Sequence, residues 1–323
     1  MRKKRFIYTL AAVLLMCSAA GVGAGCGKSS PALLDSFGTH LDTLMTSKDK
    51  LSKMDGAAAD LCVIENEDEF SENDIEAPAG ALFNITDQKT LYSKNANDER
   101  EIASITKIMT ALLAMEYADL SQEVTISYTP EGLESSAVLC GFEQGDKMML
   151  SSLLSAALIY SGNDAAIDIA IAVAGSQEAF VDMMNHESKE LMTSHTHFAN
   201  PTGLTQSKHY SSVYDVYLMF QECLKYPTFR DIIARGSFLC YYTNAAGENV
   251  TKNFNSTNQY LVGAYTPPDG TVIGGKTGHT NTAGYNLVVL VQDSHHKEYV
   301  AVILGATTKD ELYNQMNTLL SKI

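Results

Sequence analysis

Hydrophobic residues follow two different periods along the chain. In the middle of the sequence, Ala, Leu, Ile and Met recur every three or four residues, the spacing that buries one face of a helix. The apolar stretch at residues 148–174 is interrupted only at 161–164, and we interpret it as two helices joined by a tight polar corner. The pattern predicts further helices at residues 104–117, 178–192, 213–225, 229–235 and 310–323.

Short runs of β-branched and aromatic residues, bounded by turn residues, lie mostly towards the two ends of the sequence. Strands at both ends with helices between them predict an α+β fold, in which one antiparallel sheet is built from both chain ends and flanked by a helical subdomain. The predicted strands are residues 79–85, 90–93, 120–127, 238–243, 272–275, 285–291 and 299–304.

Residues 1–25 have the pattern of an export signal. Four cations at positions 2–5 precede an apolar run at 6–20 that is short for a membrane span, and small residues follow. The sequence Gly23-Ala24-Gly25-Cys26 resembles the lipobox of bacterial lipoproteins, which predicts acylation of Cys26 and a membrane anchor through that lipid. The alternative is an ordinary signal with an incidental cysteine.

The next segment, residues 26–74, is predicted to be a tether or spacer. It contains a weakly helical pattern at 29–54 and ends in a run of carboxylates at 65–76, which is typical of a solvated loop. The catalytic domain is therefore expected to cover residues 75–323.

Charge and cysteine content exclude several classes of function. A hydrophobic content of 45% is enough for a large core, and a formal charge of −15 disfavours nucleic-acid binding. The cysteines outside the signal and lipobox are widely and irregularly spaced, so we expect buried free thiols rather than a zinc site or disulfide framework. These cysteines are Cys62, Cys140, Cys223 and Cys240. No metal and no cofactor is predicted.

One pair of residues suggests nucleophilic chemistry. Ser104 and Lys107 are three positions apart, so they share one face if a helix begins here. A serine needs a base to become a nucleophile, and a lysine can be that base if burial or a second cation lowers its pKa. Such a pair is common by chance, and Ser104 alone could be a helix cap.

Two other segments give the pair a context. Ser161-Gly162-Asn163 and Lys276-Thr277-Gly278 follow it in the order seen in serine β-lactamases and penicillin-binding proteins. With its flanking residues, the chain resembles the D-alanyl-D-alanine carboxypeptidases, the low-molecular-mass penicillin-binding proteins. The stretches that carry the resemblance are residues 105–113, 161–166, 200–204, 209–212 and 275–280.

This resemblance implies a reaction at Ser104. Its hydroxyl would attack the carbonyl between the last two D-alanines of a peptidoglycan stem peptide, with Lys107 taking the proton. Lys276 would keep Lys107 neutral by repulsion and steady the anionic substrate, and Ser161 would pass a proton to the leaving amine. β-Lactam antibiotics would be covalent inhibitors.

The remaining residues would hold the substrate. Asn163 would bind the substrate backbone, and Thr277 and Gly278 would pair with it along a strand edge. The backbone N–H groups of Ser104 and His279 would form the oxyanion hole. The enzyme would act outside the cytoplasm, at the outer face of the bacterial membrane.

The sequence departs from its relatives at two points. Many relatives carry an arginine near the final strand that binds the terminal carboxylate, whereas residues 305–309 contain none, which leaves Thr277, Lys276 and Lys309 as candidates. A C-terminal β-domain and a C-terminal membrane helix are also expected to be absent, and a lipid on Cys26 would replace that anchor.

Other functions remain open at this stage. A serine β-lactamase of class A would need a glutamate in a Glu-x-x-Leu-Asn motif, and none occurs between Asn163 and Lys276. A non-catalytic penicillin-binding sensor would not need Ser104, Lys107 and Ser161 together. A D,D-endopeptidase would use the same chemistry on cross-links.

Overall fold

A computed structural model describes residues 61–64, 70, 74–128, 130–134 and 137–323, and residues 60–323 form one compact unit. The predicted export signal, Cys26, the weakly helical pattern at 29–54 and most of the predicted tether lie outside the described residues.

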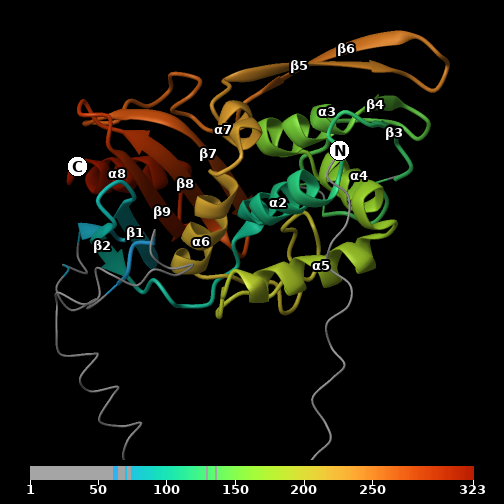
Figure 1. The fold of residues 1–323 in the computed structure, drawn as a ribbon. Helices are drawn as coiled ribbons and strands as arrows, with labels where there is room; N and C mark the ends of the chain where they lie inside the picture. The colour runs from blue at the N-terminus through green and yellow to red at the C-terminus, as the bar shows by residue number, and fades with distance from the viewer. Residues whose placement is uncertain (1–60, 65–69, 71–73, 129, 135–136) are drawn as a thin grey trace, which may run out of the picture. The chain divides into compact units, whose positions relative to one another are not determined.

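A five-stranded antiparallel sheet forms the centre of this unit (Figure 1). Its order is β2-β1-β9-β8-β7, so two strands from the N-terminal side of the unit pair with three from its C-terminal side. The predicted sheet built from both ends of the chain is confirmed. Its strands are β1 (Ala79–Asn84), β2 (Lys89–Lys94), β7 (Thr271–Thr280), β8 (Gly284–Gln292) and β9 (Glu298–Ala306).

Side chains along a strand alternate between the two faces of a sheet, and here both faces are buried. On β8, Leu287 and Val289 pack with the C-terminal helix α8 (Lys309–Leu320), whereas Val288 and Leu290 belong to the larger core beneath the other helices. A sheet covered on both faces has nearly continuous apolar strands, which is why residues 285–291 were readily predicted.

The helices occupy the predicted positions. Within the described residues, no helix is both long enough and apolar enough to cross a membrane. The predicted corner is present, since Ser161 and Gly162 separate a π-helical turn from the next helix. The helical elements are η4 (Ala103–Thr106), α2 (Lys107–Tyr117), α3 (Leu150–Ser155), η5 (Ala156–Tyr160), α4 (Asn163–Ala174), α5 (Gln177–Glu190), α6 (Val213–Cys223) and α7 (Pro227–Ile233).

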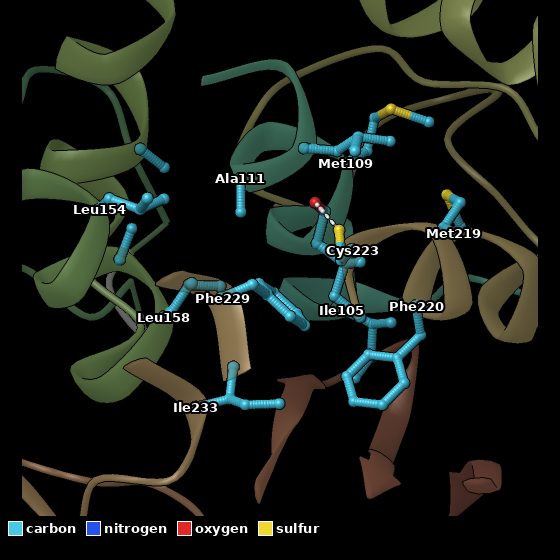
Figure 2. Close-up of a cluster of buried hydrophobic side chains, with 14 of the residues drawn as sticks. Ile105, Met109, Ala111, Leu154, Leu158, Met219, Phe220, Cys223, Phe229 and Ile233 are labelled. Carbon is cyan, nitrogen blue, oxygen red and sulfur yellow. Dashed lines mark hydrogen bonds between the residues drawn. The ribbon is translucent and has the colours of Figure 1, made fainter. Parts of the chain in front are cut away.

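Helix α2 runs through the centre of the larger core. Figure 2 shows side chains of η4 and α2, among them Ile105 and Met109, surrounded by side chains from α3, α6 and α7. Cys223 packs in the same cluster and donates a weak hydrogen bond to the Ile108 carbonyl, 3.4 Å away. Because residues 107–114 of α2 are all buried, the start of this helix is held in place by the surrounding core.

A second sheet of four strands was only partly predicted. It consists of β3 (Glu123–Thr125), β4 (Lys147–Met149), β5 (Ser237–Thr243) and β6 (Asn249–Asn255), and the β5–β6 hairpin projects beyond the helices in Figure 1. Most side chains of β6 are polar and at least partly exposed, so no apolar run marked this strand in the sequence. β7 is also longer than predicted, and it contains Lys276, Thr277 and Gly278.

The compact unit includes a short segment ahead of residue 75. Cys62 is fully buried, its N–H donates to the Tyr217 hydroxyl, and its carbonyl accepts from the Tyr214 hydroxyl. Burial raises the pKa of the Cys62 thiol to about 11. The predicted buried free thiols are confirmed, because Cys62, Cys140, Cys223 and Cys240 are all buried and unbridged.

Candidate active site

Ser104 and Lys107 lie at the junction of two helical elements. Ser104 is in the 3-10 turn η4, and Lys107 is the first residue of α2. The Lys107 Nζ lies 2.8 Å from the Ser104 Oγ, so the predicted proximity is confirmed. Lys107 is fully buried, whereas Ser104 is partly exposed. The hydroxyl can therefore meet a substrate while its partner amine stays out of water.

Two further oxygens lie within hydrogen-bonding distance of the Lys107 amine. Its Nζ is 2.8 Å from the Asn163 Oδ1 and 2.8 Å from the Thr202 carbonyl oxygen, and both of these atoms can only accept. A neutral amine has two N–H donors and one lone pair. An ammonium would donate to all three oxygens, whereas a neutral amine would use both donors on Asn163 and Thr202 and turn its lone pair towards the Ser104 hydroxyl.

The electrostatic surroundings favour that neutral amine. Burial lowers the pKa of Lys107 well below its usual range, and the charge of Lys276 lowers it further. Desolvation and a nearby like charge both disfavour an ammonium. The arrangement can therefore accept the proton of Ser104.

Ser161 and Lys276 form a second buried pair. The Lys276 Nζ donates to the Ser161 Oγ at 2.9 Å and to the Thr277 carbonyl at 2.8 Å. Ser161 has a φ of 72°, in the left-handed region, at the corner between η5 and α4. Burial lowers the pKa of Lys276 to about 7. This pair can deliver a proton near Ser104, because Ser104 and Ser161 line the same pocket.

Asn163 is occupied within the protein. Its Oδ1 accepts from Lys107, and its Nδ2 donates to the Val138 carbonyl at 3.1 Å. The contact between Asn163 and a substrate backbone stays a prediction. To make it, the Asn163 amide would have to share its present hydrogen bonds with the substrate. A role in orienting Lys107 was not anticipated from the sequence.

The loop containing Val138 is attached to the start of α4. The carboxylate of Asp164 accepts from the N–H groups of Cys140 and Gly141, each at 2.9 Å. Asp164 is buried, and charge-assisted hydrogen bonds of this kind are stronger than neutral ones. No helix or strand was predicted for this segment, although the position of Asp164 beside Ser161-Gly162-Asn163 was a usable signal.

Gly278 lets β7 approach Ser104. A Cβ atom at this position would lie 2.6 Å from the Ile102 carbonyl oxygen and 3.0 Å from the Ser104 nitrogen. β7 is the last strand of its sheet, so one of its edges has no partner strand in that sheet. Thr277, Gly278 and His279 lie along this strand beside Ser104, as predicted.

A pocket of about 490 Å³ joins these elements. The rings of His279 and Tyr285 lie 4.0 Å apart between centroids at its wall. Partial burial lowers the pKa of His279, and the charge of Lys309 lowers it further. The pocket is lined by Ser104, Val138, Tyr160, Ser161, Asn255, Ser256, Thr257, Gln259, Thr277, Gly278, His279, Tyr285, Asn286, Lys309, Leu312 and Tyr313.

Metal-ligating side chains are dispersed. Among the residues that the structure describes, no three His, Cys, Asp or Glu side chains come together as a group that could hold a metal ion. The rings of His195 and His197 make local contacts, with the Ser194 hydroxyl and the Lys208 carbonyl respectively.

Comparison with known proteins agrees with this geometry. Residues 66–308 match the family model described as D-alanyl-D-alanine carboxypeptidase. The chain belongs to this family. It is 36% identical over 251 residues to the D-alanyl-D-alanine carboxypeptidase DacF of Bacillus subtilis. This alignment covers 76% of this chain and 61% of the relative. It is 31% identical to DacA of Escherichia coli, over 73% of this chain and 58% of the relative.

The fold is also that of a solved relative. The crystal structure of the Streptomyces K15 DD-transpeptidase matches with a TM-score of 0.71 and 26% identity, covering 77% of this chain and 97% of that one. The predicted α+β fold of the penicillin-binding proteins is confirmed. The chain spans less than two thirds of the length of the two carboxypeptidases, at 61% and 58%.

Proposed function

We propose that this protein is an exported serine D,D-carboxypeptidase that removes the terminal D-alanine from peptidoglycan stem pentapeptides. The observation that carries the proposal is the hydrogen bonding of Lys107. Its Nζ lies 2.8 Å from the Ser104 Oγ, and a neutral amine would donate to Asn163 and Thr202 and keep its lone pair for the Ser104 hydroxyl. Family membership supports the same reaction.

Acylation begins with transfer of the Ser104 hydroxyl proton to Lys107. The Oγ then attacks the carbonyl carbon between the two D-alanines and gives a tetrahedral oxyanion. The N–H groups of Ser104 and His279 would stabilise this oxyanion by about 3 kcal/mol for each donor. Gly278 brings β7 against η4, because its Cβ position lies only 3.0 Å from the Ser104 nitrogen.

Collapse of the intermediate breaks the peptide bond. Ser161 gives its proton to the departing D-alanine nitrogen and is reprotonated from Lys276, 2.9 Å away. The product is an ester on Ser104. The proton that Lys107 took from Ser104 passes through Ser161 to the deprotonated Lys276, so Lys107 becomes a neutral base again. Lys107 then takes a proton from water, the hydroxide attacks the ester carbonyl, and the Ser104 oxygen leaves and recovers that proton.

Substrate alignment uses the edge of β7. An extended stem peptide can pair with the backbone at Thr277 as an added strand. The terminal carboxylate would be held by the Thr277 hydroxyl and the Lys309 ammonium, because both line the pocket and Lys309 is exposed to it. Lys309 thus takes the part that an arginine plays in many relatives.

Reaction with Ser104 can be tested directly. The protein is incubated with a fluorescent penicillin and with a peptide ending in D-Ala-D-Ala, and D-alanine release is measured. We expect covalent labelling and release from the wild type, and neither from Ser104→Ala. Ser194→Ala, which removes an exposed hydroxyl elsewhere, is the matched control and should retain both activities.

The alternatives give different results in the same experiment. Rapid penicillin turnover would identify a β-lactamase, and labelling without D-alanine release would identify a sensor. Cleavage of a cross-linked muropeptide dimer in preference to the pentapeptide would identify a D,D-endopeptidase. Each of these outcomes contradicts the carboxypeptidase proposal.

Localisation is a separate part of the proposal. We infer that residues 1–25 direct export and that a lipid on Cys26 anchors the enzyme to the outer face of the membrane. This localisation is supported by the basic residues at the start of the sequence, by the apolar run at 6–20 and by the Gly23–Cys26 sequence. Cys26→Ala should move the protein from the membrane fraction to the medium, and retention of the variant on membranes would contradict lipid anchoring.

A further inference from the structure

The residue before Ser104 has an unfavourable backbone conformation. Ala103 has a φ of 47°, in the left-handed region, although it has a Cβ atom. Such a conformation costs about 1–2 kcal/mol, so it persists only when surrounding contacts hold it. Ala103 is buried, and its carbonyl precedes the Ser104 nitrogen that is proposed for the oxyanion hole.

A directed chain of hydrogen bonds holds this carbonyl. The Thr106 Oγ1 donates to the Ala103 oxygen at 2.8 Å, and the His209 Nε2 lies 2.7 Å from the same Oγ1. The Nδ1 of His209 accepts from the Ala199 N–H at 3.0 Å. Since Nδ1 is the acceptor, the proton of the neutral imidazole is on Nε2 and points at Thr106. Thr106 then has its own proton for Ala103.

The loop ahead of His209 encloses the same peptide. A Cβ at Gly203 would lie 1.9 Å from the Ala103 carbonyl oxygen, so only glycine fits against it. The Asn200 Oδ1 accepts from the N–H of Gly203 at 2.7 Å and fixes this turn. The neighbouring Thr202 carbonyl receives the hydrogen bond from Lys107. One loop therefore contacts both the nucleophile backbone and its base.

We propose that His209 is a positioning residue for Ser104, acting through Thr106 to hold the Ala103 carbonyl so that the Ser104 N–H and Oγ face the cleft. The inference rests on the proposed acyl-enzyme function and extends it. His209 touches no substrate. It lies behind η4, where its ring packs edge-on against Phe198, 5.9 Å between centroids.

The surroundings keep His209 neutral. It is 4% exposed, and the titratable groups that face it are His197 and Lys107, neither of which supplies a negative charge. Burial, followed by the effect of these two groups, lowers the pKa of His209 to about 4. A proton on Nδ1 would face the Ala199 N–H, so the hydrogen bond between Ala199 and His209 would be lost.

The test compares two threonines on the same face. Thr106→Val removes the link to Ala103, whereas Thr110→Val removes a hydrogen bond from α2 to the Pro201 carbonyl in the same loop, 2.7 Å long. For Thr106→Val we expect penicillin acylation and the kcat for D-alanine release to fall roughly 10- to 100-fold, with little change in KM. Thr106→Ser should restore both rates, and Thr110→Val should leave them near wild type.

A double-mutant cycle places His209 in the same chain. His209→Met should lower acylation as Thr106→Val does, and the combined variant should lose no more than either alone. Thermal unfolding is measured for each variant in parallel. Wild-type rates in Thr106→Val, or equal losses in Thr106→Val and Thr110→Val that track their stability, would overturn the proposal. Absence of acylation in the wild type would instead count against the proposed function.

Discussion

The Nζ of Lys276, on β7, lies 2.9 Å from the Oγ of Ser161, at the corner between η5 and α4. The two residues are 115 positions apart in the chain, and both are buried. The charge of this buried amine lowers the pKa of Lys107 and so influences the charge state of the proposed base.

The pH dependence of acylation should depend on Lys276. Its charge lowers the pKa of Lys107, which must be neutral to accept a proton, so activity is lost as pH falls through that pKa. Lys276→Gln removes the charge and should move the acid limb of the profile to higher pH. The measurement is penicillin acylation rate against pH. Lys309→Gln is the matched control and should leave the acid limb in place; equal shifts in both variants would contradict the prediction.

The corner at Gly162 should not tolerate a side chain. A Cβ there would lie 2.2 Å from the Cys140 Sγ, so Gly162→Ala should displace Ser161, slow acylation and destabilise the protein by about 1–3 kcal/mol. Because the nearest obstacle is one sulfur atom, Cys140→Ala in the same chain should recover part of both losses. Thermal unfolding and penicillin labelling measure this, and a double variant as impaired as Gly162→Ala would refute the steric explanation.

Lys309 should distinguish a free carboxylate from an amide. Loss of a charged hydrogen bond costs about 1.5–3 kcal/mol, so in Lys309→Met the preference for D-Ala-D-Ala over D-Ala-D-alaninamide should fall by roughly 10- to 100-fold. Lys309→Arg should keep the preference. Lys225→Met, which removes a lysine paired with Glu222 on another surface, is the charge control. An unchanged ratio in Lys309→Met would show that another group binds the carboxylate.

Stability should fall in acid because of His209. Its pKa is about 4 in the folded protein and 6.5 when unperturbed, so the unfolded chain binds more protons between these values. The neutral imidazole contributes fully above pH 6.5, and its contribution disappears as pH falls to 4. The free energy of unfolding of the wild type, relative to His209→Gln, should therefore drop by about 3 kcal/mol between pH 7 and pH 4. Denaturant titrations at both pH values measure it, and a constant difference would contradict burial of a neutral histidine.

Local features of this protein followed from the sequence alone. Ser104 and Lys107 are one helical turn apart, so their side chains lie on the same face and can meet. The strands of the central sheet could be predicted from their apolar residues, because both faces of that sheet are buried. The strand β6 was not predicted, because its polar side chains remain largely exposed. The order of the three motifs indicated the family, which the comparisons confirmed.

The chemistry of the site depended on tertiary structure. Nothing in the order of residues places the Thr202 carbonyl or the Asn163 amide on Lys107, and these two contacts determine where its lone pair points. The same holds for His209 and Thr106, which lie 103 positions apart and meet only when the loop folds behind η4. Sequence patterns report neighbours within a turn or strand, but the pKa of a buried amine depends on every group packed around it, and packing brings those groups from distant parts of the chain.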